Sequence, residues 1–269
     1  MARPVDEAGL PLVYADLELA LRLADTADAL SLARFRAADL RVTRKPDRTP
    51  VTDADTAVED ALRQVITAER PDDAVLGEER GGAVTDAERG WVIDPIDGTK
   101  NFSRGVPVWA TLIALAVDGV PVVGVASAPA LGRRWWAARG EGAWTSDAQG
   151  TRRIAVSGVG ELADAYLSTT DVKTFAELGR REDYLRLVDA CWETRAFGDF
   201  WQYCLVAEGV LDIAVDAAAN PWDLAALVPL LTEAGGALTD LSGAATFAGG
   251  DGLASNGAVH KAALAIVGR

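Results

Sequence analysis

Apolar residues recur at helical spacing over the first 40 residues of the chain. Four of them lie three or four positions apart, with charged residues between them: Leu19, Leu23, Ala27 and Leu30. This pattern is typical of an amphipathic helix. We expect a loose polar lead-in over residues 1–10, and then one packing helix from about Pro11 to about Leu40.

A second helix is expected after a charged segment. The stretch from Arg41 to Pro50 contains two prolines, which favours a hairpin or a flexible loop. Thr52 or Asp53 can then cap a helix, whose apolar face comprises Val58, Ala61, Leu62 and Val65. Asp55 falls in the first turn, where the helix dipole favours a carboxylate.

Short apolar runs predict strands from residue 75 to the middle of the chain. The expected strands cover residues 75–77, 91–93, 109–117, 120–127, 135–138 and 143–144. Asp118-Gly119 is a typical hairpin turn, and the tryptophans are expected in the sheet core. We therefore predict an antiparallel sheet with helices packed on it, with a boundary near Gln149-Gly150. This boundary divides one compact unit into halves, residues 1–150 and 151–269.

The second half mixes strands and helices. Strands are expected within residues 164–169 and over 211–215, and helices over 181–188 and from about 201 to 208. Pro221 suits the first turn of another helix, which Gly235-Gly236 would end.

Composition limits the possible functions. Among 269 residues, 40 are acidic and 26 basic, giving a net charge of −14. This charge argues against a nucleic-acid-binding surface and against docking on an anionic membrane. A single histidine, His260, disfavours zinc sites and a Ser-His-Asp triad. Two cysteines, Cys191 and Cys204, are expected in the core. Without a signal-like or membrane-length apolar run, we expect a soluble cytoplasmic protein.

The stretch from Trp91 to Phe102 carries the most specific chemistry. Its apolar start predicts a buried strand that stops at Asp94, because Pro95 lacks an N–H group. A turn between Asp94 and Asp97 can aim both carboxylates at one point. Gly98 and Thr99 follow at a possible helix start, where unpaired N–H groups favour an anion. This combination indicates metal-assisted phosphate chemistry; the alternative is an Asp-Pro turn with a helix cap.

This stretch resembles the signature of the inositol-monophosphatase-like family, the lithium-sensitive, magnesium-dependent phosphatases. A second stretch, Trp222-Asp223-Leu224-Ala225-Ala226 followed by Glu233-Ala234-Gly235-Gly236, resembles the second signature of the same family. The resemblance spans roughly residues 12–265. It implies an α+β fold, a layered α/β/α/β/α sandwich, and, as is common in the family, a homodimer.

The resemblance also implies a site for two or three Mg²⁺ ions. It assigns the first ion to Glu78, Asp94 and the Ile96 carbonyl, and the second to Asp94, Asp97 and Asp223. A third ion would lie near Asp55. The phosphate would sit on the N–H groups of Gly98 and Thr99, and a water activated by the ions would attack phosphorus. Glu78, Thr99 and Asp55 are the implied catalytic residues, with the Thr99 hydroxyl orienting the water. Lys45 matches a family lysine near the site, although a solvated charge is an equal alternative.

The substrate wall is expected in the second half of the chain. Asp216 lies seven residues before Asp223, where inositol enzymes carry an acid, and Asp199 adds another acid. Extra acids suit a cationic alcohol. The strings 100–109 and Arg195-Ala196-Phe197-Gly198-Asp199 resemble the histidinol-phosphate phosphatase branch, which implies Arg195 as a further substrate residue. The alternative is that Asp199 only caps a helix and Asp216 only ends a strand.

Other functions remain open from the sequence. Within phosphatases, the substrate could be inositol monophosphate, fructose 1,6-bisphosphate or a 3′-phosphonucleotide. Outside them, the chain could be a regulatory binding protein, although all the implied metal carboxylates are present. A purely structural role leaves the acid cluster unexplained.

Overall fold

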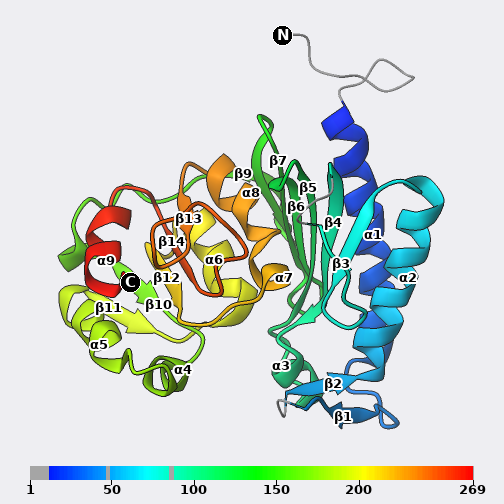
Figure 1. Ribbon diagram of the computed structural model, residues 1–269, viewed down its shortest axis with the longest axis horizontal. Helices are drawn as coiled ribbons and strands as arrows, with labels where there is room; N and C mark the ends of the chain where they lie inside the picture. Colours follow the sequence, from blue (N-terminus) through cyan, green and yellow to red (C-terminus); the bar gives the residue numbers. More distant parts are fainter. Residues whose placement is uncertain (1–11, 47–48, 85–87, 269) are drawn as a thin grey trace.

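The computed structural model of the chain describes residues 12–46, 49–84 and 88–268. Two β-sheets lie side by side, with helices on their outer sides and further helices between them (Figure 1). The order of layers is therefore α/β/α/β/α, which confirms the predicted α+β sandwich. The polar lead-in expected over residues 1–10 lies outside the described residues.

The first sheet has seven strands and is mostly antiparallel, as predicted; the exception is the parallel pair of β3 with β4. In sheet order the strands are β3 (Ala74–Gly77), β4 (Arg89–Asp97), β5 (Ala110–Val117), β6 (Val120–Ala128), β7 (Arg133–Ala138), β8 (Gly142–Asp147) and β9 (Gly150–Ile154). Asp118 and Gly119 have φ values of 50° and 73°, so the predicted hairpin turn joins β5 to β6. Because β9 belongs to this sheet, the sheet extends past Gly150.

Two helices cover the outer face of this sheet, α1 (Leu12–Arg34) and α2 (Asp53–Glu69). Their buried apolar residues pack against side chains of β4, β5 and β6. Thr52 caps α2 as predicted, because its hydroxyl accepts the backbone N–H groups of Ala54 and Asp55. Before α2, β1 (Val42–Arg44) and β2 (Pro50–Thr52) pair as an antiparallel hairpin, one of the two forms that the sequence allowed.

The first helix ends at Arg34, whereas the sequence predicted an end near Leu40. Just beyond the end, the Phe35 ring packs 5.4 Å, centroid to centroid, from each of two rings that are distant in sequence, Phe102 and Trp109. Arg36 then adopts a left-handed φ of 60°, which a continuing α-helix does not contain. Tertiary aromatic packing therefore overrides the helical pattern here.

The second sheet has five strands. In sheet order they are β11 (Glu193–Arg195), β10 (Tyr166–Ser168), β12 (Ile213–Asp216), β14 (Gly252–Ser255) and β13 (Ala237–Thr239). Three helices lie between the sheets, namely α6 (Asp199–Ala207), α7 (Pro221–Leu224) and α8 (Leu227–Glu233), and three cover the outer face, namely α4 (Val172–Glu177), α5 (Arg181–Ala190) and α9 (His260–Val267). Short turns of helix complete the fold: α3 (Thr99–Ser103), η1 (Pro129–Leu131) and η2 (Leu162–Asp164).

Two further predictions about the elements are wrong, one on the end of a strand and one on the continuity of a helix. The strand that begins before Trp91 does not stop at Asp94 but continues to Asp97, with a shift of pairing between these two residues. Pro95 lies in this shift, where its missing N–H group is not needed. The helix predicted from Pro221 is split into α7 and α8. Pro229 has no N–H group for the carbonyl four residues earlier, which explains the interruption.

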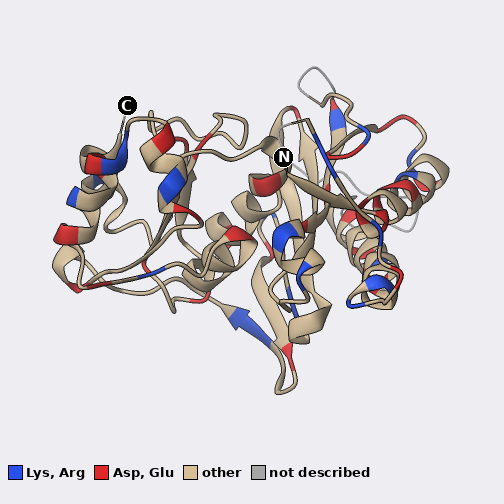
Figure 2. Cartoon of the chain, turned by 90° about the horizontal axis from the view of Figure 1, so that it is seen from below, with Lys and Arg blue, Asp and Glu red and all other residues tan. Residues whose placement is uncertain are grey.

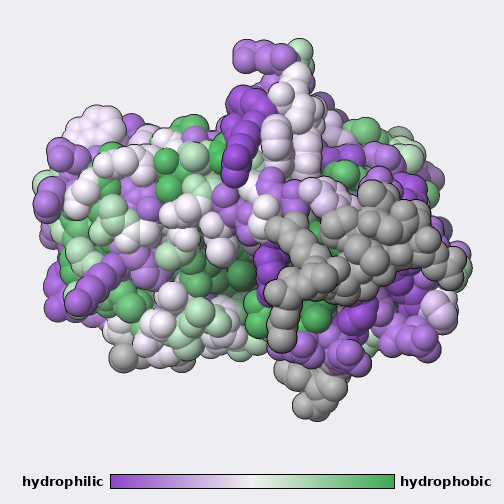
Figure 3. Space-filling view, turned by 90° about the horizontal axis from the view of Figure 1, so that it is seen from above, coloured by the Kyte–Doolittle hydropathy of each residue, from purple (hydrophilic) through white to green (hydrophobic). Residues whose placement is uncertain are grey.

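The predictions about the core hold in part, since Trp136, Trp144 and Cys191 are only partly buried. Trp91, Trp109 and Trp135 are fully buried, and both cysteines are free thiols, with Cys204 buried and Cys191 half-buried. Acidic and basic positions are interspersed over the chain (Figure 2), and apolar residues lie among polar ones on the face seen from above (Figure 3). No helix in the described part of the chain is both long and apolar enough to cross a membrane.

Candidate active site

A cavity of about 240 Å³ lies where the carboxyl end of β4 faces helices α4, α6 and α7. Seven acidic side chains line it, and Lys100 is the only Lys or Arg among the described lining residues. The acids are Glu78, Asp94, Asp97, Asp171, Asp199, Asp216 and Asp223. Its size suits a small molecule rather than a macromolecular segment.

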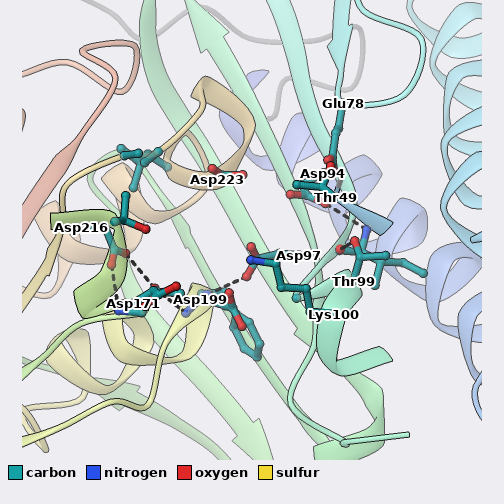
Figure 4. Close-up of a pocket in the computed structure, with 18 of the residues that line it drawn as sticks. Thr49, Glu78, Asp94, Asp97, Thr99, Lys100, Asp171, Asp199, Asp216 and Asp223 are labelled. Carbon is teal, nitrogen blue, oxygen red and sulfur yellow. Dashed lines mark hydrogen bonds between the residues drawn. The ribbon is translucent and has the colours of Figure 1, made fainter. Parts of the chain in front are cut away.

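Three of these carboxylates form a compact cluster. Asp94 and Asp97 lie at the end of β4 and Asp223 in the first turn of α7, yet ligand oxygens of all three lie within 4.8 Å of one another (Figure 4). Backbone N–H groups fix each carboxylate. Asp94 accepts from its own turn, at Ile96 (3.0 Å), Asp97 from Phe200 at the start of α6 (2.6 Å), and Asp223 from Asn220 (2.7 Å).

Burial and mutual repulsion disfavour the charged form of this cluster. Burial first, and then the charges of Glu78, Asp97 and Asp223, raise the pKa of Asp94 well above its ordinary value. Burial, with Asp199 and Asp223 nearby, raises the pKa of Asp97 in the same way. Burial also raises the pKa of Asp223 to about 7. Oxygen-ligating cations would relieve this repulsion, so the residues present fit a Mg²⁺ site.

Glu78 lies at the end of β3, beside Asp94 (Figure 4). Its carboxylate accepts a hydrogen bond from the Lys45 ammonium at 2.7 Å, and Glu79 accepts one from the same ammonium at 2.7 Å. The structure therefore brings Lys45 to the edge of the site, so that it is not merely a solvated charge. The Lys45 ammonium therefore already pairs with the carboxylate that the resemblance implies as a metal ligand.

Thr99 connects the cluster to α2. Its hydroxyl lies 2.9 Å from the Ile96 carbonyl and 3.1 Å from Asp55 Oδ1. The Asp55 side chain does not line the cavity; its other oxygen accepts the hydroxyl and N–H of Thr52. Burial raises the pKa of Asp55 to about 6. Gly98 has a φ of 84°, a conformation that favours glycine. Helix α3 begins directly after Gly98, and the first N–H groups of this helix have no acceptors within it.

The wall of the cavity that faces β4 carries three acids, Asp171, Asp199 and Asp216. The sequence indicated Asp199 and Asp216. Asp199 begins α6 with an unusual positive φ of 47°; burial raises its pKa to about 6. Asp216 lines the cavity, but its oxygens accept hydrogen bonds from Thr169, Thr170, Gln202 and Tyr203. Asp171 was missed from sequence, because an Asp before a short helix is ordinarily just a cap, and it does cap α4.

Arg195 is not brought into the cavity. It lies on the edge strand β11, where its guanidinium pairs with Glu193 at 2.7 Å and its side chain remains 55% exposed. The motif that contained it does reach the site, through Asp199 four residues later. Arg195 and Asp199 therefore differ in position although they belong to one short segment. The resemblance of the whole segment to the family did not distinguish the two residues.

Comparisons with known proteins identify the family. The Inositol monophosphatase family model matches residues 15–268. A histidinol-phosphatase of Mycobacterium tuberculosis is 57% identical over 93% of this chain and 96% of that protein, and one of Streptomyces coelicolor is 49% identical over 95% and 97%. A solved inositol monophosphatase of Zymomonas mobilis is 33% identical, with a TM-score of 0.82 over 94% of this chain and 98% of that one. The chain belongs to the inositol monophosphatase family.

Proposed function

We propose that this protein hydrolyses histidinol phosphate to histidinol and inorganic phosphate, with Mg²⁺ as its metal. The main support for this class of reaction is the carboxylate cluster. Oxygens of Asp94, Asp97 and Asp223 lie within 4.8 Å of one another, next to the backbone of Gly98 and Thr99. Membership of the family makes the chain a phosphoric monoester hydrolase. The choice of substrate draws on the histidinol-phosphatase relatives and on the acidic wall of the cavity.

The chain offers a ligand set for two ions. Glu78 and Asp94, with the Ile96 carbonyl, would hold one ion, and Asp97 and Asp223 would hold the other. The charges of Glu78, Asp97 and Asp223 all act on Asp94, so its carboxylate lies near the ligands of both ions and would contribute to holding each of them. When bound, the ions activate water and neutralise charge on the phosphoryl and leaving oxygens.

The remaining groups position the reactants. The N–H groups at the start of α3, at Gly98 and Thr99, would hold a phosphoryl oxygen. The Thr99 hydroxyl lies between the Ile96 carbonyl and Asp55, where it can orient the attacking water. The Asp55 carboxylate fixes that hydroxyl from the buried side of the site. A third ion near Asp55 would have to displace contacts that cap α2, so we propose two ions as the working set.

The alcohol part of the substrate would face the acidic wall. Histidinol carries an ammonium and an imidazole, and Asp199 and Asp171 both line the cavity. Asp216 accepts five hydrogen bonds from surrounding residues, so its oxygens have little capacity left for a ligand. We therefore assign ammonium recognition to Asp199 and a supporting role to Asp216.

Asp199→Asn tests this assignment. We expect the KM for histidinol phosphate to rise about tenfold, since a charge-assisted contact becomes a neutral one, while the kinetics with inositol 1-phosphate change less than twofold. Glu182→Gln, which removes one exposed charge from the outer face of α5, is the matched control. Equal losses on both substrates would contradict the assignment and indicate a general effect on α6.

We also propose that two copies associate. Trp192 is 68% exposed, more than any other large apolar side chain in the described part of the chain, and it adjoins the edge strand β11. Such an exposed aromatic residue is typical of an interface. Light scattering should give a mass near twice the 28.3 kDa of one chain, and a monomer at micromolar concentration would contradict this proposal.

A further inference from the structure

Helix α2 carries three polar residues on one face, Asp55, Glu59 and Arg63. They are four positions apart and therefore lie above one another along the helix. Asp55 and Glu59 are both completely buried. Asp55 contacts Thr99, as described above. The other two contact the turn that carries Glu78, and neither is part of the proposed reaction.

The Glu59 carboxylate holds the backbone on both sides of Glu78. Its Oε2 accepts the N–H group of Glu79 at 2.7 Å, and its Oε1 accepts that of Arg80 at 3.1 Å. On the preceding side it packs against Gly77, where an added Cβ would lie 2.1 Å from Oε1. Only glycine at position 77 therefore allows the carboxylate to approach this closely.

Arg63 completes the contact from the next turn of the helix. Its Nε donates to Glu59 Oε1 at 2.8 Å, which balances the buried charge. Its terminal nitrogens donate to the carbonyls of Val75 and Gly81, before and after the turn. The pair thus connects α2 to the whole segment from β3 to Gly81 through main-chain atoms.

We propose that Glu59 is a positioning residue for the metal site, because it fixes the turn from which Glu78 reaches the first ion. This inference rests on the proposed function, which assigns Glu78 to that ion. Both oxygens of Glu59 accept N–H groups, so a carboxylate is required. A glutamine of the same shape would set its NH₂ group against a backbone N–H donor and displace one side of the turn.

The test measures Mg²⁺ binding to the metal-free full-length protein by isothermal titration calorimetry. Glu59→Gln should weaken Mg²⁺ binding about tenfold, as is typical when a group that orients a metal ligand is lost. The matched control is Asp60→Asn, on the same helix turn. Asp60 binds the Arg80 side chain at 2.6 and 2.8 Å and leaves the backbone of the turn alone, so this variant should bind Mg²⁺ within twofold of the wild type.

A second readout separates positioning from general stability. In Glu59→Gln the Mg²⁺ concentration for half-maximal phosphatase activity should rise, with most of kcat recovered at saturating Mg²⁺. A lower Tm with unchanged Mg²⁺ affinity would show a merely structural role and overturn the proposal. If Glu59→Gln does not fold, Glu59→Asp decides by the same criterion, since it keeps the charge for Arg63 but is one methylene too short for the turn. If the wild type binds no Mg²⁺, the proposed function itself fails.

Discussion

Replacing Asp223 with Asn should stabilise the metal-free protein while weakening the stabilisation that Mg²⁺ gives it. Asn keeps the shape of the side chain, and its amide oxygen can still accept the Asn220 N–H group that now binds the carboxylate at 2.7 Å. The main change is therefore the loss of one negative charge from the cluster with Asp94 and Asp97. A substitution that abolishes a functional site but strengthens the fold is expected where function imposes a cost in stability.

The size of the gain follows from the pKa of Asp223, which burial raises from 3.8 to about 7. A carboxyl group whose pKa is raised in the folded state loses stability as the pH rises from 3.8 to about 7, and the full loss is present above 7. This difference corresponds to at most about 4 kcal/mol. Because water reaches part of the side chain, we expect about 2 kcal/mol, or a Tm increase of roughly 4–8 °C.

Thermal unfolding with a chelator at several pH values measures this effect. At pH 8 the variant should melt above the wild type, and the difference should shrink as the pH falls toward 4. With saturating Mg²⁺ the order should reverse, because only the wild type gains the full binding energy of the ion that Asp97 and Asp223 would hold. Asp171→Asn is the matched control, since it removes a charge from the same cavity and keeps the cap of α4. Equal Tm values for Asp223→Asn and wild type at pH 8 would show that the charge of Asp223 does not destabilise the metal-free fold.

Three further substitutions test individual roles. Asp94→Asn should reduce phosphate release at least a thousandfold with an unchanged circular dichroism spectrum, because in the proposed site Asp94 would help to hold both ions; retained activity would contradict the site. Lys45→Met should tighten Mg²⁺ binding severalfold in calorimetry, since the ammonium on Glu78 no longer competes with the ion; weaker binding would contradict competition. Thr99→Ala should lower kcat about 10–100-fold while Thr99→Ser restores most of it, and equal kcat values for the two variants would show that the hydroxyl has no part.

The cluster of three carboxylates could be anticipated from sequence because its residues lie in two short, specific strings. Asp94 and Asp97 share one turn, and Asp223 follows an Asn-Pro helix start, so local chemistry indicates each carboxylate. Their approach across 126 residues of chain depends on the packing of α7 between the two sheets, which local pattern does not contain. The resemblance to a family supplied that long-range information.

The predictions that failed have different physical causes, some between distant segments and some local. The end of α1 is set by the packing of Phe35 on two distant rings, and the fate of Arg195 by its partner Glu193. Glu59 was not singled out, because a glutamate within a helix is ordinarily solvent-exposed. Only the fold shows that it is buried and holds the turn of Glu78.

The proposed function is tested most directly by comparing phosphate release from histidinol phosphate and inositol monophosphate by the purified protein, first with Mg²⁺ and then with chelator. We expect a kcat/KM at least a hundredfold higher for histidinol phosphate, lost on chelation and restored by Mg²⁺. A preference for inositol monophosphate would keep the metal site but contradict the role given to Asp199. Turnover that survives chelation would contradict the metal site itself.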